Sequence, residues 1–393
     1  MLNHLSPPMV DLPSKRPHIL FLFSDTGGGH RSATEAIIEA LNLEFDDRIT
    51  TQMVDIFLDI APRPLNYLPK WYPYMVRMPE IWGFSYRISN GTRRARVIVE
   101  SAYPYIRRTL HKVIRQNPAD MIVSLHPLAN DPFLHALGKR RPPFITVVTD
   151  LVTTHALWYH KAVDLCLVPT EAARQHALEA GLNPEQVQLV GLPVADRFCR
   201  PAGDPIALRE KLGWPQDRPV VLLVGGGEGM GPIEKTAIAI AEANLPITLV
   251  IIAGRNQELR QRLEAHQWPM KTLIYGFVHE MPDFMRAANI LVTKAGPGTI
   301  SEALNAGLPI ILYSRLPGQE DGNVDYVISE GVGVWAPKTS YIVSALKAWI
   351  THPRQLDLAA EACCQAARPE AARQIARILA NRLGIFNEEH VRQ

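Results

Sequence analysis

The sequence of 393 residues lacks the features that mark membrane-spanning and disulfide-rich proteins. It has no uninterrupted apolar run of about 18 residues, so we expect no segment to cross a bilayer. The first residues show no basic stretch followed by an apolar one, and no signal peptide is expected. The four cysteines, Cys166, Cys199, Cys363 and Cys364, have spacings that suit neither a disulfide framework nor a zinc site. We therefore expect a protein of the reducing cytoplasm.

The sequence also lacks a strong net charge. Its 41 Lys and Arg residues against 39 Asp and Glu residues leave a charge of +2. This balance excludes a polyelectrolyte that binds partners through charge alone. The length is sufficient for two domains, each with its own core.

Three segments repeat the order strand, glycine-rich turn, helix. Apolar runs at residues 19–23, 219–224 and 290–292 each lead into a turn rich in glycine and then into a helical pattern. Further apolar runs predict strands at residues 119–124, 144–149, 165–169, 247–253, 273–275 and 310–313. This alternation predicts an α/β fold of two Rossmann-like halves with parallel sheets.

A loop-like stretch at residues 198–205 suits a hinge between the two halves. We therefore predict a first domain at residues 1–200, a second at 201–345, and C-terminal helices at 346–393. In folds of this type the last helices often cross back to the first domain.

Residues 294–309 are the most informative part of the chain because they resemble an anion site joined to a helix. Gly296 and Gly298 let a ligand approach the backbone closely, Thr299 can cap the helix, and the unpaired N–H groups of a helix start favour a phosphate. Glu302, about one turn further, suits a pair of ribose hydroxyls. Taken alone, these residues also fit a tight turn with a capping glutamate.

A polar loop at residues 317–323 follows the next predicted strand. Gln319, Glu320 and Asn323 are side chains of the kind that sugar hydroxyls require. Together with the anion site they predict the binding of a nucleotide-sugar.

His30 follows three glycines at the end of the first predicted strand. A lone histidine in a loop is commonly a surface residue. This one stands where no neighbouring side chain crowds a substrate, so we predict a general base.

Residues 61–117 concentrate basic and aromatic side chains. Eleven Lys and Arg residues against two Glu residues give this segment a charge of +9, and Trp71, Trp82, Arg93 and Arg94 lie within it. The combination predicts a monotopic membrane contact that favours anionic lipids. Core packing of the aromatics and binding of single-stranded nucleic acid are the alternatives. We expect no nucleic-acid partner, because the surrounding motifs are those of sugar transfer.

Five motifs resemble the monogalactosyldiacylglycerol synthase family. They are residues 25–31 (DTGGGHR), 124–127 (SLHP), 149–155 (TDLVTTH) with 158–160 (WYH), 225–231 (GGGEGMG) and 294–323. Members of that family are two-domain GT-B glycosyltransferases, related to the lipid-linked N-acetylglucosamine transferase of peptidoglycan synthesis. The resemblance extends from about residue 19 to residue 340 and implies a GT-B fold whose two sheets face each other across a cleft.

The resemblance implies an inverting transfer of a hexose from a UDP-sugar to diacylglycerol, with no cofactor and no obligatory metal. It places substrate at the glycines Gly28, Gly29 and Gly227, and the diphosphate at Gly296, Gly298 and Thr299. It places the ribose on Glu302, the uracil at Gly276, Phe277 and Val278, and the hexose near Gln319, Glu320 and Asn323.

On the acceptor side the resemblance implies catalysis by His30, with Asp150 and His155 either orienting it or replacing it as base. Trp158 is expected to join Trp71, Trp82, Arg93 and Arg94 on the acceptor and membrane side. Sequence spacing leaves the choice among the three candidate bases open. The enzyme is expected on the inner, cytoplasmic face of a membrane as a peripheral protein.

Residues 25–30 and 317–323 resemble the galactosyl-transferring members more than the glucosyl-transferring ones, which favours UDP-galactose as donor. The alternatives within the class are a UDP-glucose-dependent diacylglycerol glucosyltransferase and a polyprenyl-linked sugar N-acetylglucosaminyltransferase. Outside it are a UDP-sugar epimerase, which shares paired Rossmann halves, and a lipid-binding protein without enzymatic activity.

Overall fold

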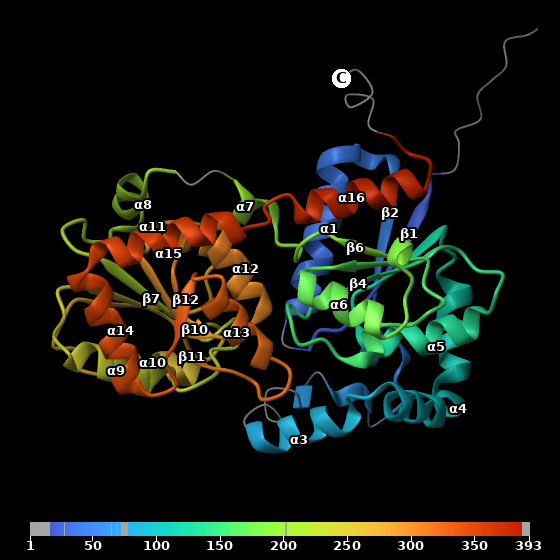
Figure 1. Cartoon of the computed structure of the whole chain (residues 1–393), viewed down its shortest axis with the longest axis horizontal. Coiled ribbons are helices and arrows are strands. Elements are labelled where there is room, and N and C mark those ends of the chain that lie inside the picture. Colours follow the sequence, from blue (N-terminus) through green and yellow to red (C-terminus); the bar gives the residue numbers. More distant parts are fainter. Residues whose placement is uncertain are drawn as a thin grey trace, which may run out of the picture.

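The chain folds into two parallel six-stranded sheets that lie side by side and are covered by helices (Figure 1). The structure is a computed structural model, and it describes residues 16–26, 28–63, 65–68, 70–71, 78–200 and 203–386. The predicted α/β fold with two Rossmann-like halves is confirmed.

The first sheet has the strand order β2-β1-β3-β4-β5-β6. Its strands are β1 (His18–Phe23), β2 (Thr50–Asp55), β3 (Met121–Ser124), β4 (Phe144–Val147), β5 (Leu165–Val168) and β6 (Val187–Leu189). The helices of this part are α1 (Gly29–Phe45), α3 (Pro79–Ser89), α4 (Thr92–Gln116), α5 (Pro127–Leu137), α6 (Glu171–Glu179) and α7 (Asp196–Cys199), with short turns η2 (Ile56–Ile60) and η4 (Ala156–Trp158).

Alternate residues of the central strands fill two separate cores. Ile19 and Phe21 of β1 pack under α1 and the C-terminal helix, whereas Leu20 and Leu22 pack on the side of α4 and α5. Burial on both faces explains why these strands are continuous apolar runs in the sequence.

The second sheet has the order β12-β11-β10-β7-β8-β9. Its strands are β7 (Val220–Val224), β8 (Thr248–Ile252), β9 (Thr272–Tyr275), β10 (Ile290–Lys294), β11 (Ile310–Ser314) and β12 (Gly333–Trp335). The helices that follow them or cover them are α8 (Pro205–Leu212), α9 (Ile233–Glu242), α10 (Gln257–Ala265), α11 (Met281–Ala287), α12 (Pro297–Asn305), α13 (Asp321–Ser329), α14 (Thr339–Thr351) and α15 (Pro353–Ala366).

In both sheets the glycine-rich turns follow strands at the point where the strand order reverses. β1 neighbours β3 in the first sheet, and β7 neighbours β10 in the second. The turn that precedes His30 follows β1, and the turns at 225–231 and at Gly296 follow β7 and β10. Ligands of open α/β sheets bind at such switch points, so the topology places all three turns where a substrate is expected.

Three strands were not predicted, and all three lie at sheet edges. β2, β6 and β12 each pair with one neighbour only. They are partly exposed, with none of the continuous burial of the central strands. An edge strand therefore needs no continuous apolar run, and its signal in the sequence is weak.

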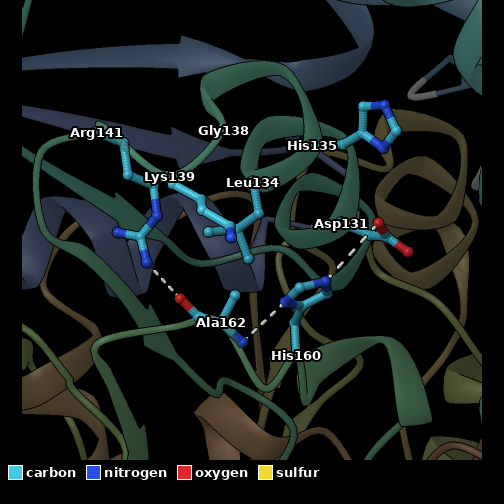
Figure 2. Close-up of a pocket in the computed structure, with 8 residues that line it drawn as sticks. All are labelled: Asp131, Leu134, His135, Gly138, Lys139, Arg141, His160 and Ala162. Carbon is cyan, nitrogen blue, oxygen red and sulfur yellow. Dashed lines mark hydrogen bonds and ion pairs between the residues drawn. The ribbon is translucent and has the colours of Figure 1, made fainter.

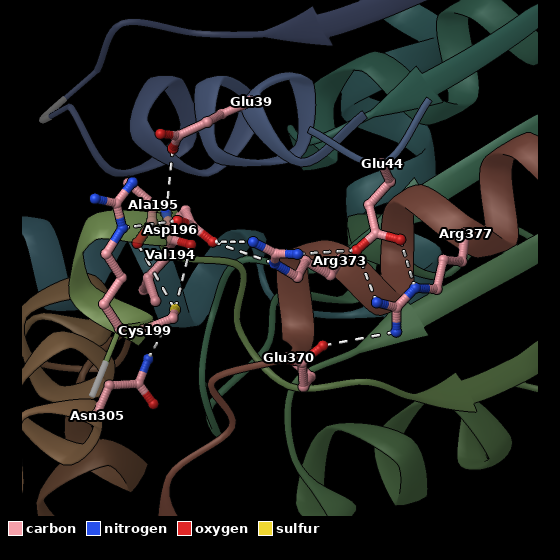
Figure 3. A network of polar contacts seen from close by, with 11 residues as sticks. Glu39, Glu44, Val194, Ala195, Asp196, Cys199, Asn305, Glu370, Arg373 and Arg377 are labelled. Carbon is pink, nitrogen blue, oxygen red and sulfur yellow. Dashed lines mark hydrogen bonds and ion pairs between the residues drawn. The ribbon is translucent and has the colours of Figure 1, made fainter. Parts of the chain in front are cut away.

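The C-terminal helix α16 (Ala371–Arg382) leaves the second sheet and packs along α1 of the first (Figure 1). Glu44 of α1, buried at its carboxylate, is held by Arg373 and Arg377 of α16 at 3.1 and 2.7 Å (Figure 3). Arg373 also binds Asp196, at the start of α7, at 2.7 Å. Hydrogen bonds from Arg377, followed by its charge and those of Arg373, hold the pKa of Glu44 below its ordinary value despite burial.

This network should contribute to stability at neutral pH. Glu44→Gln should lower the free energy of unfolding by about 1.5–3 kcal/mol, the range for hydrogen bonds to charged groups. The pKa of Glu44 is lowered in the folded state, so its stabilising effect is present above the ordinary pKa of a glutamate. The stability lost in the Glu44→Gln variant should therefore shrink as the pH falls below that value. Urea denaturation at pH 7 and at pH 4 measures both effects.

The matched control is Glu35→Gln, also on α1, whose contact with Arg31 at 3.6 Å is exposed on both sides. That change should alter stability by no more than about 0.5 kcal/mol. Equal losses of unfolding free energy in the two variants would show that the ion pairs between α1 and α16 contribute no more to stability than an exposed ion pair.

Candidate active site

His30 stands in the first turn of α1, directly after the turn at the end of β1. Gly28, the residue before the helix, has φ +78°, a left-handed conformation that glycine adopts without strain. The Nδ1 atom of His30 lies 2.7 Å from the hydroxyl of Thr149, which follows β4. A hydroxyl at this distance fixes the orientation of the ring. The sequence does not predict that Thr149 orients His30.

Two aromatic rings enclose His30. The His126 ring lies 4.8 Å away edge-on, and the Trp158 ring lies 6.1 Å away. Burial lowers the pKa of the His30 imidazole to about 4, against a smaller opposing hydrogen bond with the Leu125 backbone. Part of the residue reaches solvent. Because its pKa lies well below 7, the ring is neutral at physiological pH, and a neutral ring is what a proton acceptor requires.

Asp150 lies behind this group. Its carboxylate accepts a hydrogen bond from Nε1 of Trp158 at 2.6 Å and a longer one from Nε2 of Gln319 at 3.4 Å. Burial raises the pKa of Asp150 to about 6, although these donors favour its ionised form. Trp158 thus stands between Asp150 and His30.

The His155 side chain belongs to a different set of contacts, although the backbone N–H of His155 donates to Asp150. Its Nδ1 accepts the Leu157 N–H, and its Nε2 lies 3.2 Å from the Ser89 hydroxyl of α3. Burial lowers the pKa of His155 to about 4. Among the described residues neither Asp150 nor His155 hydrogen-bonds to His30; Thr149 does. The catalytic roles given to these residues from the sequence stay predictions.

In the second half, α12 begins at Pro297, directly after β10 and two loop residues. Gly296 precedes it, and no side chain caps the helix. The expectation that Thr299 caps it is wrong, because Thr299 lies inside the first turn. The start of α12 therefore presents uncapped N–H groups to an anion, with nothing within 4 Å of the Cβ position of Gly298.

Glu302 lies further along α12. Among the described residues its carboxylate makes no hydrogen bond or ion pair; Arg197 acts on it only through its charge. Burial raises the pKa of Glu302 to about 7, and Arg197 opposes this weakly. Although part of Glu302 reaches solvent, a largely desolvated carboxylate without hydrogen-bond donors is suited to accept them from a ligand.

Two more cations border this region and were not assigned from the sequence. Lys294 at the end of β10 binds Glu320 at 2.9 Å, and both side chains are largely buried. Its Nζ lies 2.9 Å from the position that a Cβ on Gly296 would take, so it stands beside the start of α12. Arg255 lies over the Phe277 ring at 4.3 Å and within reach of Gly227.

Gly276 and Val278 flank Phe277 directly after β9, so the structure brings the three predicted uracil residues next to Gly227. Phe277 is exposed, with 43% of its surface accessible. Arg255, which also pairs with Glu228 at 2.8 Å, covers part of it.

Residues 315–320, the β11–α13 loop, lie between the two halves. Glu320 accepts the Leu316 N–H, and Asn323 of α13 donates to the Ala295 carbonyl at 2.8 Å. The Oε1 atom of Gln319 and the Oδ1 atom of Asn323 are buried and have no hydrogen-bond partner among the described residues. Unpaired buried acceptors are costly and point to a ligand that donates to them.

The same loop and α13 contact the first half directly. The Gly322 N–H donates to the Thr153 hydroxyl at 2.9 Å, and Gln319 reaches Asp150. The residues predicted to bind the sugar and the residues around His30 therefore form one site.

The residues predicted to face a membrane have different surroundings. Trp71 is exposed, and Trp82 is partly buried in α3. Arg93 and Arg94 lie in α4, and their side chains are outside the described structure. Trp158 is fully buried against Asp150 and His30, so it does not face a membrane, and its place on the acceptor side stays a prediction.

A cavity of about 490 Å³ lies away from this site. It is formed by α5 and the residues after η4, and Asp131, His135, Lys139, Arg141 and His160 line it (Figure 2). Arg141 is bound to Asp164, and His160 lies 3.9 Å from Asp131. Asp131 and His160 thus face each other within the lining, and Arg141 is held by Asp164, which is not a lining residue.

In the described part of the chain, no group of three or more His, Cys, Asp and Glu side chains is arranged to hold a metal ion. Every helix there is too short or too polar to cross a bilayer.

Solved structures share the fold across almost the whole chain. The UDP-N-acetylglucosamine 2-epimerase from Neisseria meningitidis, bound to its UDP-sugar, superposes with a TM-score of 0.57, 14% identity and coverage of 93% of this chain and 99% of that one. MurG from Acinetobacter baumannii gives a TM-score of 0.58, also at 14% identity, with coverage of 93% and 99%. At these identities the likeness concerns the fold alone, and the fold is GT-B.

The sequence relationship is closer. Residues 30–194 match the family model of monogalactosyldiacylglycerol synthase, and residues 220–375 match the C-terminal domain of glycosyltransferase family 28. Monogalactosyldiacylglycerol synthase 1 of Arabidopsis thaliana, a chloroplastic protein, is 37% identical over 94% of this chain and 72% of its own length. The chain belongs to the monogalactosyldiacylglycerol synthase family, as the sequence motifs predict.

Proposed function

We propose that this chain transfers galactose from UDP-galactose to the free hydroxyl of 1,2-diacylglycerol, with inversion, to give a β-linked galactolipid. Membership of the family supports the reaction. The observation that carries it is the contact between the two halves, in which Gln319 of the β11–α13 loop reaches Asp150 beside Trp158 and His30. Donor sugar and acceptor base thereby share one site.

The donor binds to the second half. Its diphosphate occupies the start of α12, where the backbone N–H groups and Lys294 supply positive charge. Its ribose hydroxyls donate to Glu302, and its uracil lies at Gly276, Phe277 and Val278. The helix end and Lys294 stabilise the negative charge that develops on departing UDP, so the transfer as proposed needs no resident cofactor.

The acceptor enters from the first half. His30 takes the proton of the diacylglycerol hydroxyl as that oxygen attacks the anomeric carbon on the face opposite UDP. Thr149 holds the ring, and the nearby diphosphate of the bound donor raises the low pKa of the imidazole toward the range of an effective base. Asp150 positions the hexose through Gln319.

Galactose and glucose differ only at the C4 hydroxyl. The buried acceptor oxygens of Gln319 and Asn323 are suited to one orientation of such hydroxyls, because the wrong epimer leaves them unpaired. The glucosyl, polyprenyl-linked and epimerase alternatives are not favoured by the family relationship.

The lipid acceptor requires contact with a membrane, which we assign to the cytoplasmic face. Seven of the large apolar side chains that the first half exposes lie between residues 58 and 105, whereas Leu43, Leu128 and Leu189 lie elsewhere. The seven are Leu58, Trp71, Met78, Phe84, Ile88, Val97 and Tyr105. The same region carries the charge of +9, and each cation near an anionic surface contributes ~1 kcal/mol. Apolar side chains beside cations support peripheral binding to anionic lipids.

The product of the purified protein tests the reaction. With diacylglycerol in anionic vesicles, UDP-galactose should give a higher kcat/KM than UDP-glucose, and NMR of the product should show a β linkage. Gln319→Ala should reduce the difference in kcat/KM between the two donors, because it should impair galactose transfer more than glucose transfer. Gln175→Ala, at an exposed position of α6, should leave that difference unchanged. A preference for UDP-glucose in the unmodified protein would move the assignment to the glucosyl alternative.

His30→Ala should lower kcat by ~10²–10⁴-fold, the usual contribution of general base catalysis, with UDP affinity nearly unchanged. Thr149→Val, which removes only the hydroxyl contact, should lower kcat about ten-fold, the effect of one hydrogen bond. Thr149→Ser, which keeps the hydroxyl, should retain most of the rate. Parallel loss of UDP binding in the His30 variant, or a full rate, would remove His30 from this role.

Glu302 should make donor affinity dependent on pH. Ribose hydroxyls favour its ionised form, so UDP-galactose binding must displace a proton below the free-protein pKa of about 7. In the His30→Ala variant, where no imidazole can take up a proton as the diphosphate binds, affinity should rise by up to about ten-fold per pH unit below pH 7 and level off above it. Isothermal titration calorimetry from pH 5.5 to 8 measures this, and UDP-galactose itself does not titrate in that range.

Glu302→Gln should bind more weakly and lose the pH dependence. Asp150→Asn is the control, because it removes another carboxyl whose pKa burial raises, while leaving Glu302 in place. A donor affinity of the His30→Ala variant that does not change with pH would contradict the ribose assignment.

Vesicle binding should depend on lipid charge. Replacing Arg93, Arg94 and Arg96 together with Gln should raise the lipid concentration for half-maximal activity, and salt should weaken binding of the unmodified protein. The same charge change at the exposed residues Lys211, Arg218 and Arg354 of the second half serves as control. Equal behaviour of the two triple variants in vesicle sedimentation would exclude this segment as the membrane contact.

A further inference from the structure

Helix α3 has two faces with different surroundings. Phe84 and Ile88, four residues apart, are exposed to 62% and 46%. Gly83 and Tyr86, three residues apart on the other side, are buried and face the second half of the molecule. In Figure 1 α3 lies where the two halves meet. One helix therefore joins the apolar outer surface to the donor side.

The inner face of α3 packs against the β11–α13 loop with no spare room. A Cβ on Gly83 would lie 2.8 Å from Cβ of Pro317 and 3.2 Å from its carbonyl oxygen. A Cβ on Gly318, which has φ +85°, would lie 2.9 Å from the Tyr86 ring. Neither contact tolerates an added atom, so α3 cannot move toward the loop without displacing it.

The loop contains Gln319 and Glu320, two of the side chains assigned to the hexose. Tyr86 also reaches the Thr153 carbonyl at 3.4 Å, and Thr153 receives the Gly322 N–H. The Tyr86 ring, the loop and Thr153 form a continuous contact from α3 to the sugar-binding residues.

We infer that α3 couples membrane contact to donor-sugar binding: its outer face meets a bilayer, and its inner face then holds the β11–α13 loop in the conformation that binds the hexose. The occupant of the outer face is a bilayer rather than a protein, because the exposed apolar side chains lie within the segment of charge +9. The inference rests on the proposed function.

Coupling of this kind is reciprocal. If a bilayer favours the sugar-binding conformation of the loop, it tightens UDP-galactose binding, and UDP-galactose tightens vesicle binding by the same factor. UDP, which lacks the hexose, is not subject to this coupling.

The test measures the Kd of UDP-galactose and of UDP by calorimetry, with and without anionic vesicles that contain no diacylglycerol. We expect vesicles to tighten UDP-galactose binding about five-fold or more and to leave UDP binding unchanged. Equal Kd values for UDP-galactose with and without vesicles, or equal tightening of UDP, would overturn the inference.

Two variants locate the coupling. Gly83→Ala forces Pro317 away and should abolish the effect of vesicles on the Kd of UDP-galactose. The substitution does not weaken the helix itself, because alanine is a better helix former than glycine. Tyr86→Leu removes the ring from Gly318 and should do the same. Retention of the full vesicle effect in both variants would also overturn the inference.

Gly91→Ala is the matched control, because nothing lies within 4 Å of its Cβ position and its extended backbone suits any residue. It should behave as the unmodified protein. Failure of the coupling is distinguishable from failure of the proposed function, since galactolipid formation on diacylglycerol vesicles is measured separately. Galactolipid formation without a vesicle effect on Kd would reject the coupling alone.

Discussion

The contact between the β11–α13 loop and the first half of the molecule is the interaction on which the rest of the site depends. The Gly322 N–H on the Thr153 hydroxyl, and Gln319 on Asp150, join two sheets that otherwise carry separate halves of the chemistry. Transfer of a sugar requires the acceptor oxygen and the anomeric carbon to meet in one geometry. Two substrates that are held in a shared site reach this geometry far more often than two molecules that collide in water. Without this contact, His30 and the start of α12 would be unrelated surfaces.

Burial at the junction sets the protonation states that transfer needs. It lowers the pKa of the His30 imidazole to about 4 and raises the pKa of the Asp150 and Glu302 carboxyls to about 6 and 7. At neutral pH the free site thus holds a neutral imidazole, an Asp150 carboxyl that is largely ionised and a Glu302 carboxyl that is poised to ionise. The donor supplies what each group lacks: hydroxyls for Glu302, and negative charge near His30.

The central strands and the glycine turns were predictable because strands buried on both faces are continuous apolar runs, and because turns at switch points need glycine. The edge strands β2, β6 and β12 were not, since partial exposure removes that signal. The sequence likewise indicates His30 and Glu302 as candidates. It does not indicate Thr149 as the partner of His30, the burial of Trp158, or Lys294 beside Gly296, because these contacts join residues that are distant in sequence or depend on side-chain direction.

A crystal structure of the protein with bound UDP is the most direct test of this arrangement. We expect the diphosphate at the start of α12, the ribose hydroxyls on Glu302, the uracil beside Gly276, Phe277 and Val278, and Gly322 of α13 still bound to Thr153. UDP bound in the cavity beside Asp131 and His160, or bound with its ribose away from Glu302, would contradict it.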